Sequence, residues 1–115
     1  MRILIIEDDA ELAASIAEYL ELQGARCDFA YNGATGVKLA TELGFDVILL
    51  DLMLPKLNGI DACQEMRRLG CDLPILMLTA IDTDADQLAG FRAGIDDYVI
   101  KPCQMPLLWA RLEAL

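Results

Sequence analysis

The sequence contains no histidine, and its four cysteines form no C-x-x-C pair. They lie far apart along the chain, at Cys27, Cys63, Cys71 and Cys103. Structural zinc sites use cysteine and histidine ligands, so a site of this kind would here require all four cysteines. Scattered cysteines more often pack as small hydrophobic residues, and free thiols fit a reducing compartment. We therefore expect neither a zinc site nor a disulfide.

Long apolar runs are also missing. The longest, such as Val47–Leu50 and Ile75–Leu78, have the length of β-strands, whereas a membrane-spanning helix needs about 20 apolar residues. Arg2 is followed by only four apolar residues before Glu7, too few for a signal peptide. We expect a soluble, cytoplasmic protein that makes no contact with a membrane.

Basic residues are scarce. The sequence has nine of them against 19 acidic residues, which gives a net charge of −10. Such a surface repels nucleic acid and favours cationic partners or a metal ion. We therefore expect no direct contact between this part of the protein and nucleic acid.

Short apolar runs alternate with segments of helical period. Hydrophobic residues make up 56% of the 115 residues, which suits one domain over residues 1–115. The predicted strands are Ile3–Ile6, Arg26–Phe29, Val47–Leu50, Ile75–Leu78 and Tyr98–Ile100. Between them, apolar residues recur every three or four positions, as in amphipathic helices. Five βα units in series predict an α/β fold with a doubly wound parallel sheet and helices on both faces.

The predicted helices carry recognisable end signals. Left-handed glycines are expected after four helices, at Gly24, Gly44, Gly70 and Gly94. Asp8 or Asp9 is expected to cap the first helix, and Pro106 to be the first residue of the last.

Polar residues follow four of the predicted strands at their carboxyl ends. In chain order they are Glu7, Asp8 and Asp9, then Asp51, then Thr79, then Lys101. Ligands of open α/β sheets bind at this edge, so we expect these side chains to converge. A solvated acidic rim would explain any one carboxylate, but it does not explain a hydroxyl and an amine at the same strand ends.

These residue types suit phosphoryl transfer. Clustered carboxylates repel one another unless a cation neutralises them, and oxygen ligands favour Mg²⁺. A carboxylate such as Asp51 can attack phosphorus and form an aspartyl phosphate. Lys101 supplies positive charge, and the Thr79 hydroxyl can donate to a phosphoryl oxygen.

Four blocks of sequence resemble the receiver domains of two-component response regulators. They are ILIIEDD at 3–9, VILLDLMLP at 47–55, PILMLTA at 74–80 and DDYVIKP at 96–102. The resemblance implies a flavodoxin-like (βα)5 three-layer sandwich with strand order 2-1-3-4-5. It implies a signalling switch that receives its phosphoryl group from a separate histidine kinase. Such a domain is not a separate enzyme, although it assists its own phosphoryl transfer and autodephosphorylation.

The resemblance also assigns roles within the site. Asp51 occupies the position that resembles the family's phosphoacceptor. By the same resemblance, Asp8 and Asp51 would be direct Mg²⁺ ligands, and the Met53 backbone carbonyl would be a third ligand. Glu7 would bind the metal through a water molecule, whereas we interpret Asp9 as a helix cap.

Two residues resemble the family's switch. Thr79 would move towards the phosphoryl group and Tyr98 would turn inward into the vacated space. Tyr98 as an amphipathic aromatic residue at the rim is the alternative. Met53 and Ile81 occupy the positions beside the attacking water, and because both are apolar we predict slow autodephosphorylation.

The segment WARLEAL at 109–115 resembles the end of receivers that precede a winged-helix DNA-binding domain. An effector domain that regulates transcription would then lie beyond Leu115. Such receivers dimerise through the fourth helix, fifth strand and fifth helix, and Asp97 and Arg111 match two of the charged residues involved. Four residues depart from the pattern: Gln87, Arg92, Cys103 and Leu107. A homodimer with fewer charged contacts and a monomer both remain possible.

Three other functions compete with this reading. A haloacid-dehalogenase-like phosphohydrolase would need an acid at position 53, where Met53 stands. A flavodoxin-like FMN-binding protein would need a Gly/Ser/Thr-rich phosphate loop after the first strand, where three acids stand instead. A stand-alone or phosphorylation-independent receiver would act as a protein-binding module, but such domains usually lose an acid, the threonine or the lysine.

Overall fold

Strands and helices alternate along the chain, which the computed structural model describes from residue 1 to residue 115. The strands are β1 (Arg2–Ile6), β2 (Arg26–Ala30), β3 (Val47–Leu50), β4 (Ile75–Thr79) and β5 (Asp97–Ile100). The helices are α1 (Ala10–Leu22), α2 (Gly33–Glu42), α3 (Gly59–Arg68), α4 (Asp84–Ala93) and α5 (Met105–Ala114). The predicted strand β3 has the observed bounds, and the other four are each one residue longer than predicted.

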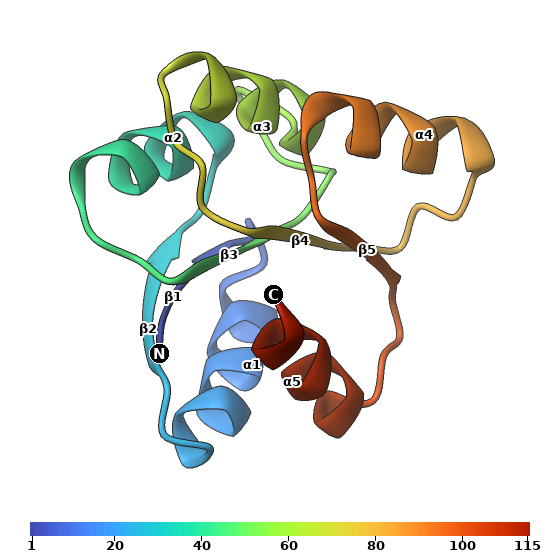
Figure 1. The fold of residues 1–115 in the computed structure, drawn as a ribbon. Coiled ribbons are helices and arrows are strands. Elements are labelled where there is room, and N and C mark those ends of the chain that lie inside the picture. Colours follow the sequence, from blue (N-terminus) through green and yellow to red (C-terminus); the bar gives the residue numbers. More distant parts are fainter.

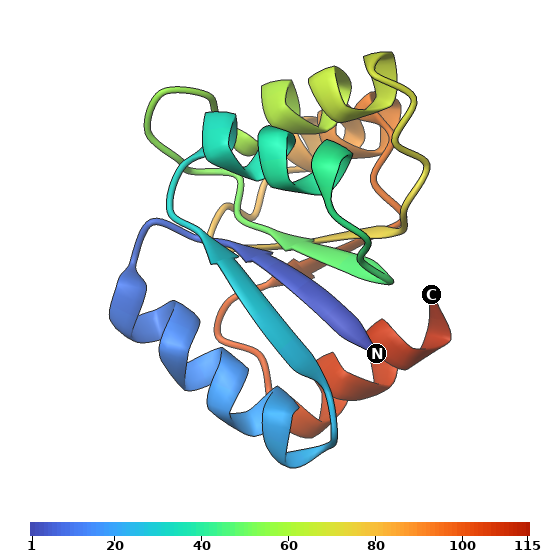
Figure 2. The same ribbon diagram turned by 90° about the vertical axis from the view of Figure 1, so that its left-hand side faces the viewer.

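The strands form one parallel sheet in the order β2-β1-β3-β4-β5, which confirms the predicted α/β fold. Figure 1 shows α1 and α5 on one face of the sheet and α2, α3 and α4 on the other. Turning the molecule shows the same three layers from the side (Figure 2). The sheet reverses its direction of winding at β1, so the loops after β1 and β3 lie at the switch point where ligands of such folds bind.

Two hydrophobic clusters, one on each side of the sheet, hold the layers together. The apolar runs of β1, β3 and β4 are buried throughout and alternate between the two clusters, because successive side chains of a strand point to opposite faces. One cluster packs against α2 and α3, and the other against α1 and α5. The strand ends are therefore fixed in position by burial on both faces.

The helix ends agree with most of the predicted signals. The Asp9 carboxylate accepts a hydrogen bond from the Leu12 backbone N–H at 3.1 Å and so caps α1, as predicted. Gly24, Gly70 and Gly94 have the expected positive φ angles.

Two of the predicted end signals were wrong. Gly44 is not left-handed, because Leu43 ends α2 in an extended conformation. That geometry lets the Gly44 carbonyl accept a hydrogen bond from Arg2 at 3.1 Å. Pro106 is the second residue of α5 rather than the first, since the helix begins at Met105.

All four cysteines are free thiols. Cys63 is buried, as expected of a small hydrophobic residue, whereas the other three are half-buried. None of the helices is both long enough and apolar enough to cross a membrane.

Candidate functional site

The strand register brings the two buried acids together. Ile6 lies opposite Leu50 in the parallel pair of β1 and β3, so the next residues, Glu7 and Asp51, leave the sheet side by side. Glu7 is 4% exposed and Asp51 is 8% exposed, whereas Asp8 is exposed. A buried pair of carboxylates requires a compensating positive charge.

Lys101 supplies that charge from the end of β5. Thr79 lies opposite Ile100, and the Lys101 backbone N–H donates to the Thr79 carbonyl at 2.8 Å. The Lys101 Nζ lies 2.6 Å from Glu7 Oε1 and 3.3 Å from Asp51 Oδ2. The ammonium group therefore bridges both buried acids, so the structure brings together three of the residues expected to converge, Glu7, Asp51 and Lys101. The Asp9 carboxylate instead caps α1, and the Thr79 hydroxyl contacts Ile81 rather than these three residues.

The electrostatics of the site favour a charged lysine. Burial alone would lower the pKa of Lys101, but the hydrogen bond to Glu7 and the negative charges of Asp51 and Glu7 outweigh burial and raise it. Burial raises the pKa of the Glu7 carboxyl, and the hydrogen bond from Lys101 offsets this only in part. The site thus holds a positively charged lysine next to a glutamate whose burial makes it costly to ionise.

The acids at this edge also fit a divalent cation. One carboxylate oxygen each from Glu7, Asp8 and Asp51 can be chosen so that all three lie within 4.8 Å of one another. Hard oxygen ligands of this kind suit Mg²⁺. The Met53 backbone N–H donates to Asp51 Oδ1 at 3.3 Å, which orients the carboxylate. The role of the Met53 carbonyl as a metal ligand stays a prediction.

The loop after Asp51 is held by a close approach of α3. The Gly59 backbone N–H donates to the Leu52 carbonyl at 2.8 Å. A Cβ atom at Gly59 would lie 2.2 Å from the Asp51 carbonyl oxygen, so only glycine permits this contact. The Asn58 side chain caps α3 by accepting from the Asp61 N–H at 2.9 Å.

Thr79 and Tyr98 are connected through one residue, Ile81. The Thr79 hydroxyl oxygen accepts from the Ile81 backbone N–H at 3.4 Å, and the Tyr98 hydroxyl donates to the Ile81 carbonyl at 2.8 Å. Thr79 is buried and Tyr98 is half-buried. Tyr98 therefore has a specific polar partner, which a rim aromatic residue would not require. Its inward movement stays a prediction.

The predicted output face is formed by α4, β5 and α5. Asp97 and Arg111, which the sequence suggested for contacts between subunits, form an ion pair within one chain at 3.0 Å. Leu107 is half exposed, at 50%, and Arg92 is also exposed, whereas Gln87 is partly buried. Dimerisation through this face stays a prediction.

Sequence reasoning missed the role of Arg67. Its guanidinium group donates to the carbonyls of Cys71, Leu73 and Gly94 at 2.7 to 3.1 Å. It also lies 3.3 Å from Asp96, whose carboxylate accepts from the Ile75 N–H at 2.8 Å. Asp96 therefore links Arg67 of α3 to the start of β4. Backbone carbonyls leave no signal in the sequence, so this contact could not be predicted.

Known proteins are similar to this chain in sequence and in fold. The response regulator receiver domain family matches over residues 3–113. Response regulator MprA of Mycobacterium avium is 38% identical, over 100% of this chain and 50% of that protein. The DNA-binding dual master transcriptional regulator RpaA of Synechocystis is 43% identical, over 99% of this chain and 48% of that protein. The chain thus spans about half the length of these relatives.

One similar solved structure contains a metal ion in its active site. The receiver domain of the sensor histidine kinase PA1611 from Pseudomonas aeruginosa, with a magnesium ion coordinated in its active-site cleft, is 32% identical and superposes with a TM-score of 0.90. The match covers 98% of this chain and 94% of that one. The sequence, the strand order and the acidic strand ends agree, and this chain belongs to the response regulator receiver domain family of two-component systems.

Proposed function

We propose that this chain is a phosphorylation-dependent switch that accepts a phosphoryl group from a histidine kinase on Asp51, with Mg²⁺. The observation that carries the proposal is the contact of one ammonium group with two buried carboxylates, Lys101 Nζ with Glu7 and Asp51. A phosphoryl group entering this acidic site needs positive charge close to its oxygens.

The side chains around Asp51 supply positioning rather than a reactive base. A carboxylate oxygen of Asp51 forms the new bond to phosphorus, while the bond from phosphorus to the donor nitrogen breaks. Lys101, which already lies 3.3 Å from Asp51, can neutralise a phosphoryl oxygen. Thr79 lies at the neighbouring strand end, and its hydroxyl can donate to another oxygen once it turns from Ile81.

The metal ion would be held by Asp8 and Asp51 directly and by Glu7 through water, with the Met53 carbonyl completing the protein ligands. When bound, Mg²⁺ adds charge neutralisation at the phosphoryl oxygens. Convergence of the three carboxylates and the magnesium-containing relative support this assignment.

The output is proposed from the relatives. RpaA is named as a DNA-binding transcriptional regulator, and this chain spans about half of it. We infer a DNA-binding effector domain in the full-length protein, a cytoplasmic location, and dimerisation of the active state through α4, β5 and α5. With Gln87 and Leu107 in place of charged residues on that face, such a dimer would depend less on salt.

The test uses acetyl phosphate as a small donor. The wild-type chain, incubated with Mg²⁺ and acetyl phosphate, should gain the mass of one phosphoryl group, and Asp51→Asn should gain none. Asp84→Asn is the matched control, since Asp84 is an acid in the first turn of α4 outside the site. Beryllofluoride with Mg²⁺ should change the amide NMR spectrum of the wild type. An unchanged mass together with an unchanged spectrum would refute the proposal.

A further inference from the structure

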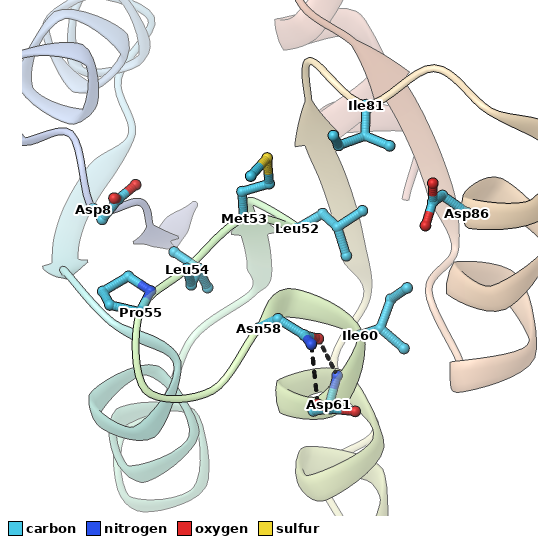
Figure 3. A pocket seen from close by; sticks show the side chains of 10 residues that line it. All are labelled: Asp8, Leu52, Met53, Leu54, Pro55, Asn58, Ile60, Asp61, Ile81 and Asp86. Atoms are coloured by element: carbon cyan, nitrogen blue, oxygen red, sulfur yellow. Dashed lines mark hydrogen bonds between the residues drawn. The ribbon is translucent and has the colours of Figure 1, made fainter.

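A groove of about 630 Å³ opens beside the acidic site, between the β3–α3 loop and the segment that leads from β4 to α4. Figure 3 shows Leu52 and Ile60 on one side and Ile81 and Asp86 on the other, all facing the same space. Met53 also lines the groove, and 61% of its surface is exposed. The groove is thus an apolar depression that the chain itself leaves open.

Every charged residue that lines this groove is acidic. Asp61 lies in the first turn of α3, Asp86 lies in the first turn of α4, and Asp8 lies at the end nearest the metal site. The amino ends of α3 and α4 would by themselves favour an anion, but carboxylates in their first turns oppose that effect. The rim therefore complements positive charge.

Local hydrogen bonds hold the two first-turn acids in place. Asp61 accepts from the Asn58 amide at 3.0 Å, and Asp86 accepts from the Thr83 hydroxyl at 2.5 Å. Each of these partners is neutral, so both carboxylates keep their negative charge available to a ligand. A metal ion alone would not explain the apolar walls, and an apolar ligand alone would not explain the acidic rim.

We propose that this groove binds an amphipathic cationic segment of a partner protein, with an apolar side chain between lysines or arginines. The apolar side chain would pack on Ile60, Ile81 and Met53, while the cations would face Asp61 and Asp86. A protein with a net charge of −10 attracts such a partner at long range as well. This binding does not require phosphorylation of Asp51.

The groove is also connected to the switch residues. Ile81, which lines it, is hydrogen-bonded through its backbone to Thr79 and to Tyr98. A segment packed on Ile81 would therefore contact the residue that links Thr79 to Tyr98.

The test titrates the ¹⁵N-labelled chain with the peptide Ac-Lys-Leu-Phe-Lys-NH2 and with its charge-reversed form Ac-Glu-Leu-Phe-Glu-NH2. The lysine peptide should shift the amides of Met53, Ile60 and Ile81, together with those of Thr79 and Tyr98, and the glutamate peptide should not. Asp86→Asn should weaken binding by about two- to fivefold, as expected for one exposed ion pair. Asp84→Asn, in the same helical turn but outside the groove, should bind like wild type.

Equal binding of both peptides, shifts that map elsewhere, or equal affinities for Asp86→Asn and Asp84→Asn would overturn the proposal. The same titration with Asp51→Asn separates it from the proposed function. Binding of the lysine peptide by Asp51→Asn would support the groove proposal even if acetyl phosphate fails to modify the wild type. Phosphorylation of the wild type would support the proposed function even if neither peptide binds.

Discussion

Lys101 and Glu7 are separated by 94 positions in the sequence, yet the lysine Nζ lies 2.6 Å from the glutamate Oε1. The contact joins the end of the last strand to the end of the first, across the central strands β3 and β4. Because Glu7 is buried, this ion pair compensates a charge that would otherwise strongly disfavour folding. The acidic site is therefore already partly neutralised by the protein's own lysine.

Mg²⁺ should stabilise the protein through Asp8. At a Mg²⁺ concentration of about 100 times its dissociation constant, the free energy of unfolding should rise by about 2.7 kcal/mol. Asp8→Asn should remove most of this increase. Asp9→Asn should retain it, because Asp9 caps α1 and asparagine caps a helix equally well. Urea denaturation with and without Mg²⁺ measures the difference, and a full Mg²⁺ response in Asp8→Asn would contradict the assignment.

The phosphoryl group on Asp51 should be long-lived, because Met53 and Ile81 place no polar group beside the attacking water. Ile81→Glu should accelerate loss of the phosphoryl group by about tenfold, less than the roughly 100-fold that a well-positioned general base supplies. Ile81→Val is the control, since it remains apolar and keeps the backbone contacts. Intact mass followed over time after removal of acetyl phosphate gives the rates. Faster loss in wild type than in Ile81→Glu would show the prediction to be wrong.

Arg67 should be one of the most important surface residues for stability. Arg67→Ala leaves the carbonyls of Cys71, Leu73 and Gly94 without their donor, and should lower the free energy of unfolding by about 3 kcal/mol. Its neighbour Arg68 is exposed and pairs only with Glu65. Arg68→Ala should therefore leave stability nearly unchanged in urea denaturation. Similar losses in both variants would argue against a specific role for Arg67.

Cys27 should react slowly with alkylating reagents. Burial, together with the negative charges of Glu21 and Asp28, raises the pKa of its thiol from 9.0 to about 11. At pH 8 the thiolate fraction is then roughly 100-fold lower than in an unfolded chain, and the thiolate is the reactive form. Iodoacetamide labelling, followed by peptide mass spectrometry, should show Cys27 modified slowly at pH 8 and faster as the pH approaches 11.

The same raised pKa has a consequence for stability. The unfolded thiol ionises near pH 9.0 and the folded one near 11, so the contribution of Cys27 is complete below pH 9 and is lost as the pH rises through 11. In Cys27→Ala this part of the alkaline decrease should disappear. An identical decrease in both proteins would assign it to other groups, such as Lys101 and Tyr98, whose pKa values are also raised.

Much of the fold could be predicted because its signals are local. The apolar runs of β1, β3 and β4 are buried on both faces, and their ends are marked by the first polar residue. The convergence of Glu7, Asp51 and Lys101 also followed from the sequence, since parallel strands end at a common edge.

Features that depend on the backbone of distant segments could not be predicted in this way. Gly44 looked like the other helix-terminating glycines, but α2 ends in an extended residue whose geometry is coupled to Arg2. The role of Arg67 carries no sequence signal because its partners are backbone carbonyls of two separate loops. The groove beside Asp51 depends on how far the loops after β3 and β4 stand apart, and no residue pattern sets that distance.

Ile81 accepts a hydrogen bond from Tyr98 with its carbonyl and donates one to Thr79 with its N–H, while its side chain lines the groove. Ile81 thus contacts both the proposed switch residues and the groove proposed to bind a partner protein. We therefore expect the lifetime of the signal and the choice of its recipient to be linked in this domain. A single substitution of Ile81 should then change both how long the domain signals and which protein it binds.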